Sequence, residues 1–350
     1  MELEKRINAF SKLGMFLGQF VHGIAEQELS EINARFYDDF NALIDRQRAF
    51  NAWFDRESVL KAIGAISGQL TPEKLNAWLA PYSLPEGHKT IGVIMAGNIP
   101  LVGFHDYLSV LIAGHKLQAK LSAEDGTLLK KVSEVLMEME PAFQDRIQFV
   151  ERLSRFDAVI ATGSNNTARY FNQYFGKYPH IIRKNRNSVA VIHADDEVED
   201  IKKLAPDVFD YYGLGCRNVS KLYLPENFPV NRIFEAFYDW SDVVENNKYV
   251  NNYEYNKAVY LMGSNQLLDN NFVLLKEDSG LSSPVGVLHY EYYRSLNELK
   301  QHLASLKDDL QCIVSGDKHA DGYLNFGEAQ CPALSDYADG VDTIAFLSAL

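Results

Sequence analysis

Hydrophobic positions in the first 85 residues recur with helical spacing. The apolar residues between Leu3 and Leu17 lie about one turn apart, which predicts a helix buried along one face. A second helix is expected over residues 24–44. Thr71-Pro72-Glu73 is typical of a helix start, because it combines a hydroxyl cap, a proline in the first turn and an acid. The region is therefore expected to be helical.

After residue 87, short apolar runs alternate with helical segments. Strands are expected at 90–95, 117–120, 147–150, 158–161, 189–192, 272–275, 285–289 and 311–314. Helices are expected between them, at 102–113, 124–139, 164–174, 198–210, 233–240 and 295–306. This alternation indicates an α/β protein whose parallel sheets are covered by helices on both faces.

Length, charge and cysteine content narrow the class of protein. A chain of 350 residues is typical of about two domains, and a net charge of −13 argues against a nucleic-acid partner. No signal peptide is recognisable, and no apolar run reaches the ~20 residues that span a membrane. The three cysteines are widely spaced and form neither a disulfide framework nor a metal motif. We therefore expect a cytoplasmic protein without a membrane span or a metal.

The segment from Tyr211 to Ser220 contains the main chemical candidate. Gly213 and Gly215 lead into Cys216, and glycine allows a backbone to approach a ligand closely. A thiol on such a turn can meet a substrate carbonyl with little steric obstruction. The alternative is a tight turn with an ordinary buried cysteine, since free cysteines are among the most buried residues.

Several motifs, in order and with similar spacing, resemble those of the aldehyde dehydrogenase superfamily. They are Asn98 to Leu101, Ala113-Gly114 with Lys120, Thr162-Gly163-Ser164, residues 189–196, Gly213 to Cys216, and Ser283-Pro284-Val285. The resemblance covers residues 91–315 and implies two Rossmann-like parallel-sheet lobes with an N-terminal helical region. The implied segments are a helical region at 1–85, an NAD(P)-binding domain at 86–212, a catalytic domain carrying the cysteine at 213–328, and a C-terminal return segment at 329–350.

The end of the chain makes the resemblance more specific. Residues 330–332 and 337–347 look like the tail of acyl-CoA reductases related to the fatty-acid reductase of bacterial luminescence. Arg183 stands where the dehydrogenase branch keeps a glutamate that activates water, and Gly280 stands where the family has a glutamate that holds a cofactor ribose. The resemblance thus implies reduction of an acyl-CoA or acyl-carrier thioester to an aldehyde, with NADPH, or else NADH, as cofactor.

The implied chemistry gives roles to six residues. Cys216 would form the acyl-enzyme, and Asn98 would donate its amide to the oxyanion. Local sequence alone favours a helix-capping turn residue at Asn98, and the resemblance reverses that preference. His180 is the candidate base, because an imidazole titrates near neutral pH, and its alternative is a strand-edge histidine without a role. Lys120 and Gly163-Ser164 would bind the cofactor, through its ribose and a phosphate respectively; without the resemblance they are a solvated charge and a helix cap.

Two other functions stay open from the sequence. One is an NAD(P)-dependent aldehyde dehydrogenase, and the other is a redox-inactive protein that only carries an acyl group on Cys216. Cys312 lies among apolar residues and is expected in the core, whereas Cys331 receives no role. The expected partners are the thioester substrate, an acyl-transferring protein and further copies of the chain in a homo-oligomer.

Overall fold

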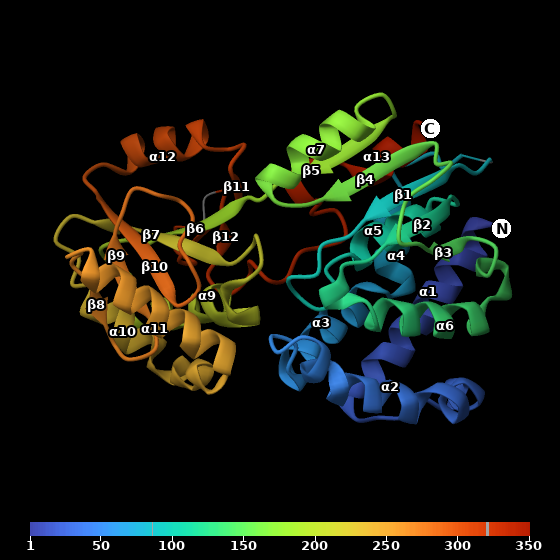
Figure 1. Ribbon diagram of the computed structural model, residues 1–350, viewed down its shortest axis with the longest axis horizontal. Coiled ribbons are helices and arrows are strands. Elements are labelled where there is room, and N and C mark those ends of the chain that lie inside the picture. The colour runs from blue at the N-terminus through green and yellow to red at the C-terminus, as the bar shows by residue number, and fades with distance from the viewer. Residues whose placement is uncertain (86, 320–321) are drawn as a thin grey trace. The chain divides into compact units, whose positions relative to one another are not determined.

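The computed structural model describes residues 1–85, 87–319 and 322–350, which form two compact units (Figure 1). The first unit comprises residues 1–184 and 333–350, and the second comprises residues 185–332. The sequence-based boundaries differ from this division, because the N-terminal helices share a core with the first sheet and residues 185–212 belong to the second unit. Glu86, at the expected junction of the first two segments, lies outside the described residues.

Four helices begin the first unit: α1 (Leu3–His22), α2 (Ser30–Phe50), α3 (Arg56–Gln69) and α4 (Pro72–Leu79). The predicted apolar stripe of α1 is buried, and Thr71 caps α4 by accepting a hydrogen bond from the Lys74 N–H. The second helix begins at Ser30 and not near residue 24, because the left-handed Gly23 ends α1 and a short 3₁₀ turn precedes α2. The helical prediction for this region is confirmed.

The first unit contains a five-stranded parallel sheet. Its strands are β1 (Thr90–Ile94), β2 (Lys116–Lys120), β3 (Ile147–Phe149), β4 (Ala158–Thr162) and β5 (His180–Arg183). Its helices are α5 (Phe104–Ile112), α6 (Leu128–Met139) and α7 (Asn165–Phe175). The strand order β3-β2-β1-β4-β5 reverses direction between β1 and β4. Open parallel sheets bind ligands beyond the carboxyl ends of their strands at such a switch point.

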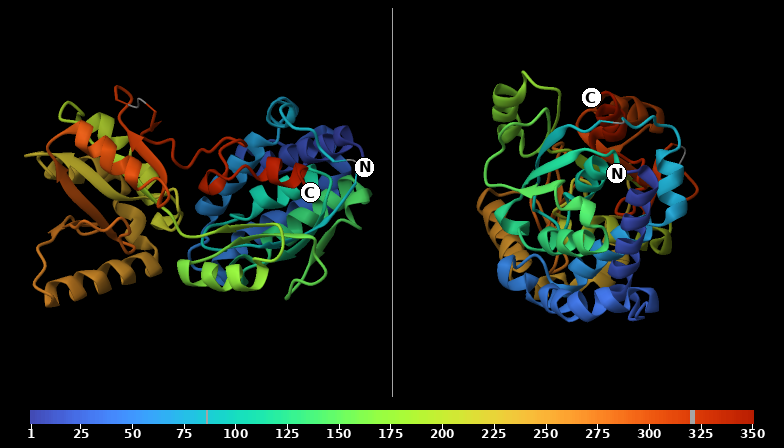
Figure 2. Two further views of the ribbon diagram at one scale, coloured as in Figure 1. Left: turned by 90° about the horizontal axis from the view of Figure 1, so that it is seen from above. Right: turned by 90° about the vertical axis from the view of Figure 1, so that its right-hand side faces the viewer.

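The end of the chain returns to the first unit, as the sequence predicts. Helix α13 (Thr343–Ser348) packs near α5, and both termini lie in this unit (Figure 2). The indole N–H of Trp78 donates to the Tyr337 hydroxyl at 2.8 Å, and a ring nitrogen of His115 lies 3.0 Å from the Leu347 carbonyl. The last 18 residues are thus part of the fold of the first unit.

The second unit contains a seven-stranded sheet. Its strands are β6 (Asn187–Val191), β7 (Val219–Pro225), β8 (Leu268–Asp269), β9 (Leu274–Glu277), β10 (Val287–Tyr293), β11 (Leu310–Ser315) and β12 (Leu324–Asn325). Its helices are α8 (Val198–Lys202), α9 (Ala205–Phe209), α10 (Asn231–Phe237), α11 (Asn247–Met262) and α12 (Leu296–Ser305). The order is β12-β11-β6-β7-β10-β9-β8, and only the β8–β9 pair is antiparallel. The predicted α/β class with two parallel sheets is confirmed.

Some elements differ from the prediction. The single helix expected at 198–210 is divided into α8 and α9, with Pro206 in the first turn of α9, where its missing N–H costs no hydrogen bond. Strand β5 and helix α11 were not predicted. In the part of the chain that the structure describes, no helix is long and apolar enough to cross a bilayer.

Candidate active site

Cys216 lies on the loop between α9 and β7, and its side chain is exposed. The three residues Tyr211, Tyr212 and Gly213 have φ values of 52°, 58° and 75°, all in the left-handed region. For residues with a side chain this conformation costs ~1–2 kcal/mol each, so other contacts must hold it in place. Strain of this kind is typical of functional loops.

Asn218 supplies the main contacts of this loop. Its Oδ1 accepts a hydrogen bond from the Gly215 N–H at 2.8 Å, and its Nδ2 donates to the carbonyls of Asp207 at 3.1 Å and Asp210 at 2.9 Å. The side chain is only 3% exposed. It therefore joins the two sides of the left-handed turn and fixes the backbone directly before Cys216.

Two further contacts hold the backbone around Cys216. The buried Ser188 hydroxyl, at the start of β6, donates to the Cys216 carbonyl at 3.0 Å and accepts from the Cys312 N–H at 3.1 Å. The guanidinium of Arg217 donates to the Ala329 carbonyl at 2.6 Å. Cys312 is buried in the core, as predicted, whereas the Cys216 loop is anchored to both neighbouring segments.

Asp207 holds the segment that Arg217 contacts. Its carboxylate accepts hydrogen bonds from the Gly327 N–H at 2.7 Å and the Ala329 N–H at 3.0 Å. Burial raises the pKa of Asp207 to about 7, against the opposing effect of these two hydrogen bonds. The loop of Cys216 thus rests on a buried hydrogen-bond network that no local sequence motif indicated.

Asn98 lies in the first unit, on the turn between β1 and α5. Gly97 allows this turn to pack closely against the segment after β2, because a Cβ atom on residue 97 would lie 2.5 Å from the Ser122 Cβ. Leu101 has a left-handed φ of 56°, and its N–H donates to the Asp125 carboxylate at 2.8 Å. Burial raises the pKa of Asp125 to about 6. By accepting this hydrogen bond, the buried Asp125 side chain holds the turn that carries Asn98 in place.

The cofactor candidates share the carboxyl edge of the first sheet with Asn98. Lys120 ends β2, and Gly163 and Ser164 lie between β4 and α7, beside the switch point. A Cβ atom on Gly163 would lie 3.0 Å from Thr167 and Phe171, so glycine is needed for α7 to pack this closely. Ser164 caps α7 by accepting from the Thr167 N–H at 3.3 Å. An exposed helix start at the switch point fits the pyrophosphate of a dinucleotide.

The structure does not bring His180 to this edge. His180 begins β5, whereas the other candidates of the first unit follow the ends of their strands. Its Nδ1 lies 2.8 Å from the Tyr178 carbonyl. Parallel strands point the same way, so His180 lies at the amino edge of the sheet, and its position within the first unit does not support a role beside Asn98.

Arg183 is a buried structural residue at the end of β5, which corrects its expected place in a loop. Its side chain is 6% exposed, and it donates to the Asp106 carboxylate on α5 at 2.6 Å and to the Thr343 hydroxyl on α13 at 2.9 Å. These contacts hold the C-terminal segment against the first unit.

The segment around Gly280 is held by two side chains, those of Lys221 and His289. The ammonium of Lys221, which is fully buried, donates to the Ser279 carbonyl at 2.8 Å and pairs with Glu291 at 2.6 Å. The Nδ1 of His289 lies 3.0 Å from the Gly280 carbonyl, and burial lowers the pKa of this histidine. Lys221 and His289 are neighbours on β7 and β10, so they face the same side of the sheet.

Comparisons with solved structures find a similar architecture in aldehyde dehydrogenases. Aldehyde dehydrogenase 21 from Physcomitrella patens, in complex with succinate, is 13% identical, with a TM-score of 0.66 over 100% of this chain and 84% of that one. The P. syringae indole-3-acetaldehyde dehydrogenase AldA, with NAD+, is 11% identical, with a TM-score of 0.65 over 92% and 74%.

A Mycobacterium tuberculosis aldehyde dehydrogenase complexed with NAD+ is 14% identical, with a TM-score of 0.59 over 90% of this chain and 74% of that one. No family model and no curated protein matches the sequence. At this level of identity the similarity defines the fold, and the chain has an aldehyde-dehydrogenase-like fold.

Proposed function

We propose that the protein is an NAD(P)-dependent oxidoreductase that acts on an aldehyde-level or thioester carbonyl through Cys216. The observation that carries this proposal is the exposed thiol on a strained loop whose backbone is fixed by Asn218 and Ser188, within an aldehyde-dehydrogenase-like fold. The finer proposal is reduction of an acyl-CoA to an aldehyde.

The residues act in a defined order. The Cys216 thiolate attacks the thioester carbonyl, an oxyanion forms, and the CoA thiolate leaves as the carbonyl reforms on the enzyme. Both sulfurs are thiolates of similar basicity, so this exchange is nearly balanced and needs little acid assistance. Asn98 is proposed to donate its amide to the oxyanion, and loss of such a donor costs ~3–4 kcal/mol of transition-state stabilisation. The turn that carries Asn98 is held by the hydrogen bond from the Leu101 N–H to the Asp125 carboxylate, and this support suits Asn98 to that task.

The reduced nicotinamide supplies a hydride to the acyl carbon when it is bound. Lys120 and the start of α7 at Ser164 are proposed to hold its adenosine ribose and pyrophosphate. Cys216 would then serve as the leaving group: collapse of the oxyanion that it carries would break the bond between its sulfur and the acyl carbon, releasing the aldehyde and regenerating the Cys216 thiolate. The overall change is acyl-CoA plus reduced cofactor plus a proton giving aldehyde, CoA and oxidised cofactor. NADPH is the proposed donor, and the base that forms the thiolate is not assigned.

An NAD(P)-dependent aldehyde dehydrogenase is the second candidate, because the similar solved structures carry that name and two of them contain NAD+. It requires a residue that activates water for attack on the acyl-enzyme. Arg183, at the aligned position, is buried with Asp106 and Thr343 and is unsuited to that role. This difference favours the reductase.

The assay that separates the candidates follows cofactor absorbance in two mixtures. One contains NADPH and a series of acyl-CoAs, and the other contains NAD+ or NADP+ and the matching aldehydes. The reductase should consume NADPH and release aldehyde, with little free acid. A protein that only oxidises aldehyde to acid is a dehydrogenase, and one that is acylated without any cofactor turnover is an acyl carrier.

A further inference from the structure

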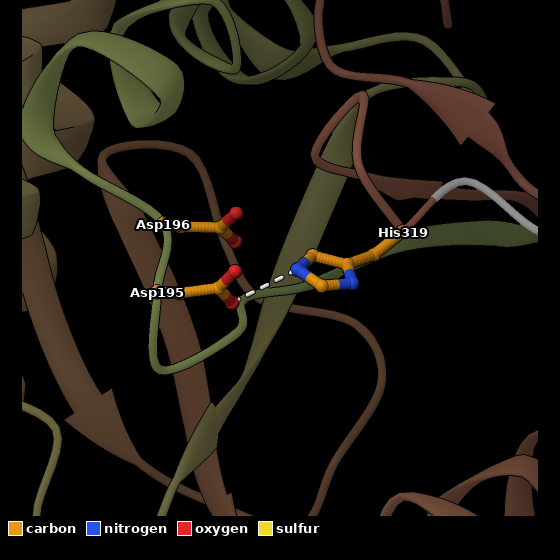
Figure 3. Close-up of side chains that lie close together, drawn as sticks. All are labelled: Asp195, Asp196 and His319. Atoms are coloured by element: carbon orange, nitrogen blue, oxygen red, sulfur yellow. Dashed lines mark hydrogen bonds and ion pairs between the residues drawn. The ribbon is translucent and has the colours of Figure 1, made fainter.

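A second cluster of side chains that could bind a metal lies in the same unit as Cys216, beyond the carboxyl ends of two strands, whereas the Cys216 loop precedes the amino end of β7. Asp195 and Asp196 follow β6, and His319 follows β11 (Figure 3). β6 and β11 are adjacent strands, but β6 is followed by β7 toward one edge of the sheet and β11 is followed by β12 toward the other edge. This is the switch point of the second sheet, where open α/β sheets place ligands.

The three side chains converge on one point. One ligand atom from each of Asp195, Asp196 and His319 lies within 4.8 Å of the other two. The Nε2 of His319 and the Oδ1 of Asp195 are 2.9 Å apart. Ligands of a tetrahedral Zn²⁺ ion lie roughly 3.4 Å from one another. Small rotations of the Asp195 and His319 side chains, both partly exposed, therefore suffice to enclose an ion.

Asp196 is the observation that points to a ligand. Its side chain is buried, with the residue only 1% exposed, and its Oδ2 accepts a hydrogen bond from the His193 N–H at 2.7 Å. Its Oδ1 accepts no hydrogen bond from any residue that the structure describes. Gly316 packs closely against this carboxylate, because a Cβ atom there would lie 2.6 Å from the Oδ1. A carboxylate on so buried a residue, beside a second carboxylate, is costly unless a cation compensates its charge.

The His193 ring stacks against the ring of His319. The two rings stack at 3.9 Å with an interplanar angle of 19°. The His193 side chain is itself buried. Its Nε2 lies 3.2 Å from the Ser315 hydroxyl. This arrangement fixes the plane of His319, as residues around a metal site commonly do for a ligating imidazole.

We propose that Asp195, Asp196 and His319 bind a divalent transition-metal ion such as Zn²⁺. Two carboxylates and one imidazole suit Zn²⁺ better than Mg²⁺, which prefers oxygen ligands alone. The ion would join the loops after β6 and β11, whose ligands lie 124 residues apart in the sequence. The site does not depend on the proposed reductase activity, and it differs from the metal-free protein expected from the sequence.

The test is equilibrium dialysis of tag-free, chelator-treated protein against Zn²⁺, with bound metal measured by elemental mass spectrometry. We expect one ion per wild-type chain. Asp196→Asn keeps the shape of the side chain and should weaken binding by at least about tenfold. Asp195→Asn and His319→Gln alter more exposed residues and should weaken it similarly. His22→Gln, which changes an exposed histidine in the other unit, should bind as wild type does.

Two further readouts keep the result interpretable. Zn²⁺ should raise the thermal midpoint of the wild type but not of Asp195→Asn, and Mg²⁺ at the same concentration should have little effect. Bound Co²⁺ should give visible absorption bands that are lost in His319→Gln. The proposal is overturned if the wild type binds less than one ion at micromolar Zn²⁺, or if the three site variants bind as well as His22→Gln.

Discussion

Replacing Asn218 by alanine should release the loop that presents Cys216. The Asn218 side chain is the single group that bonds the Gly215 N–H on one side and the carbonyls of Asp207 and Asp210 on the other. Alanine removes all three contacts without adding bulk. The left-handed residues between these anchors would then lose the contacts that offset their strain.

The expected magnitude follows from the groups left without partners. One half-buried N–H, that of Gly215, and two carbonyls lose a hydrogen bond, and each such group costs about 1–3 kcal/mol when it stays unsatisfied. Taking the lower end, because the loop can relax toward water, gives a loss of about 3 kcal/mol. We therefore expect Asn218→Ala to lower the free energy of unfolding by about this amount and to slow acylation of Cys216 at least about tenfold. Asn218→Asp should do no better, since its second oxygen would face two carbonyls.

The assay compares urea unfolding curves with the rate of acylation by an acyl-CoA, followed by intact-protein mass. Asn252→Ala is the matched control, because Asn252 on α11 donates to the Lys248 carbonyl at 2.8 Å on the exposed surface of the same unit. This control should change either quantity little. If the urea unfolding curve and the acylation rate of Asn218→Ala match those of the control, the loop does not depend on Asn218 and the reasoning is refuted.

Three further changes test other parts of the chain. Cys216→Ala should abolish acylation measured by intact mass, whereas Cys331→Ala should not; acylation that persists without Cys216 would remove it as nucleophile. Deletion of the residues after Asp339 removes α13 and Thr343 and should give unstable or aggregated protein, so a soluble truncate with a normal melting curve would contradict the packing. Because burial raises the pKa of Asp125 from 3.8 to about 6, its folded form keeps a proton that the unfolded chain releases, and this contribution should lower the free energy of unfolding as pH rises from about 4 to about 6. Asp125→Asn should lack that contribution, and identical pH slopes for the two proteins would argue against it.

The sequence predicts those parts of the fold in which local pattern and tertiary environment agree. Strands β1 and β4 are buried on both faces, so their apolar runs are unmistakable. Strand β5 has four residues with two charged or polar ends, too short for a pattern to stand out. Helix α11 buries only Tyr249 and Tyr253, so its sequence shows no hydrophobic stripe. The extent of α11, from Asn247 to Met262, is therefore apparent only from the structure.

The candidate site is predictable only in part, for a related reason. Glycines near Cys216 indicate a turn, but the three successive left-handed residues and the Asn218 contacts arise from backbone geometry. Arg183 illustrates the limit of alignment, because its partners Asp106 and Thr343 lie 77 and 160 residues away in the sequence. The proposed metal ligands likewise come from two loops far apart in the sequence, so no spacing motif could reveal them.

The central claim, that Cys216 carries an acyl group which the cofactor then reduces, can be tested in one experiment. The protein is incubated with an acyl-CoA without cofactor, and the modified residue is found by peptide mass spectrometry; NADPH is then added, and aldehyde and free acid are measured together. The account predicts an acyl group on Cys216 that persists until NADPH converts it mainly to aldehyde. Acylation at another residue, or release of acid faster than aldehyde with saturating NADPH, would contradict it.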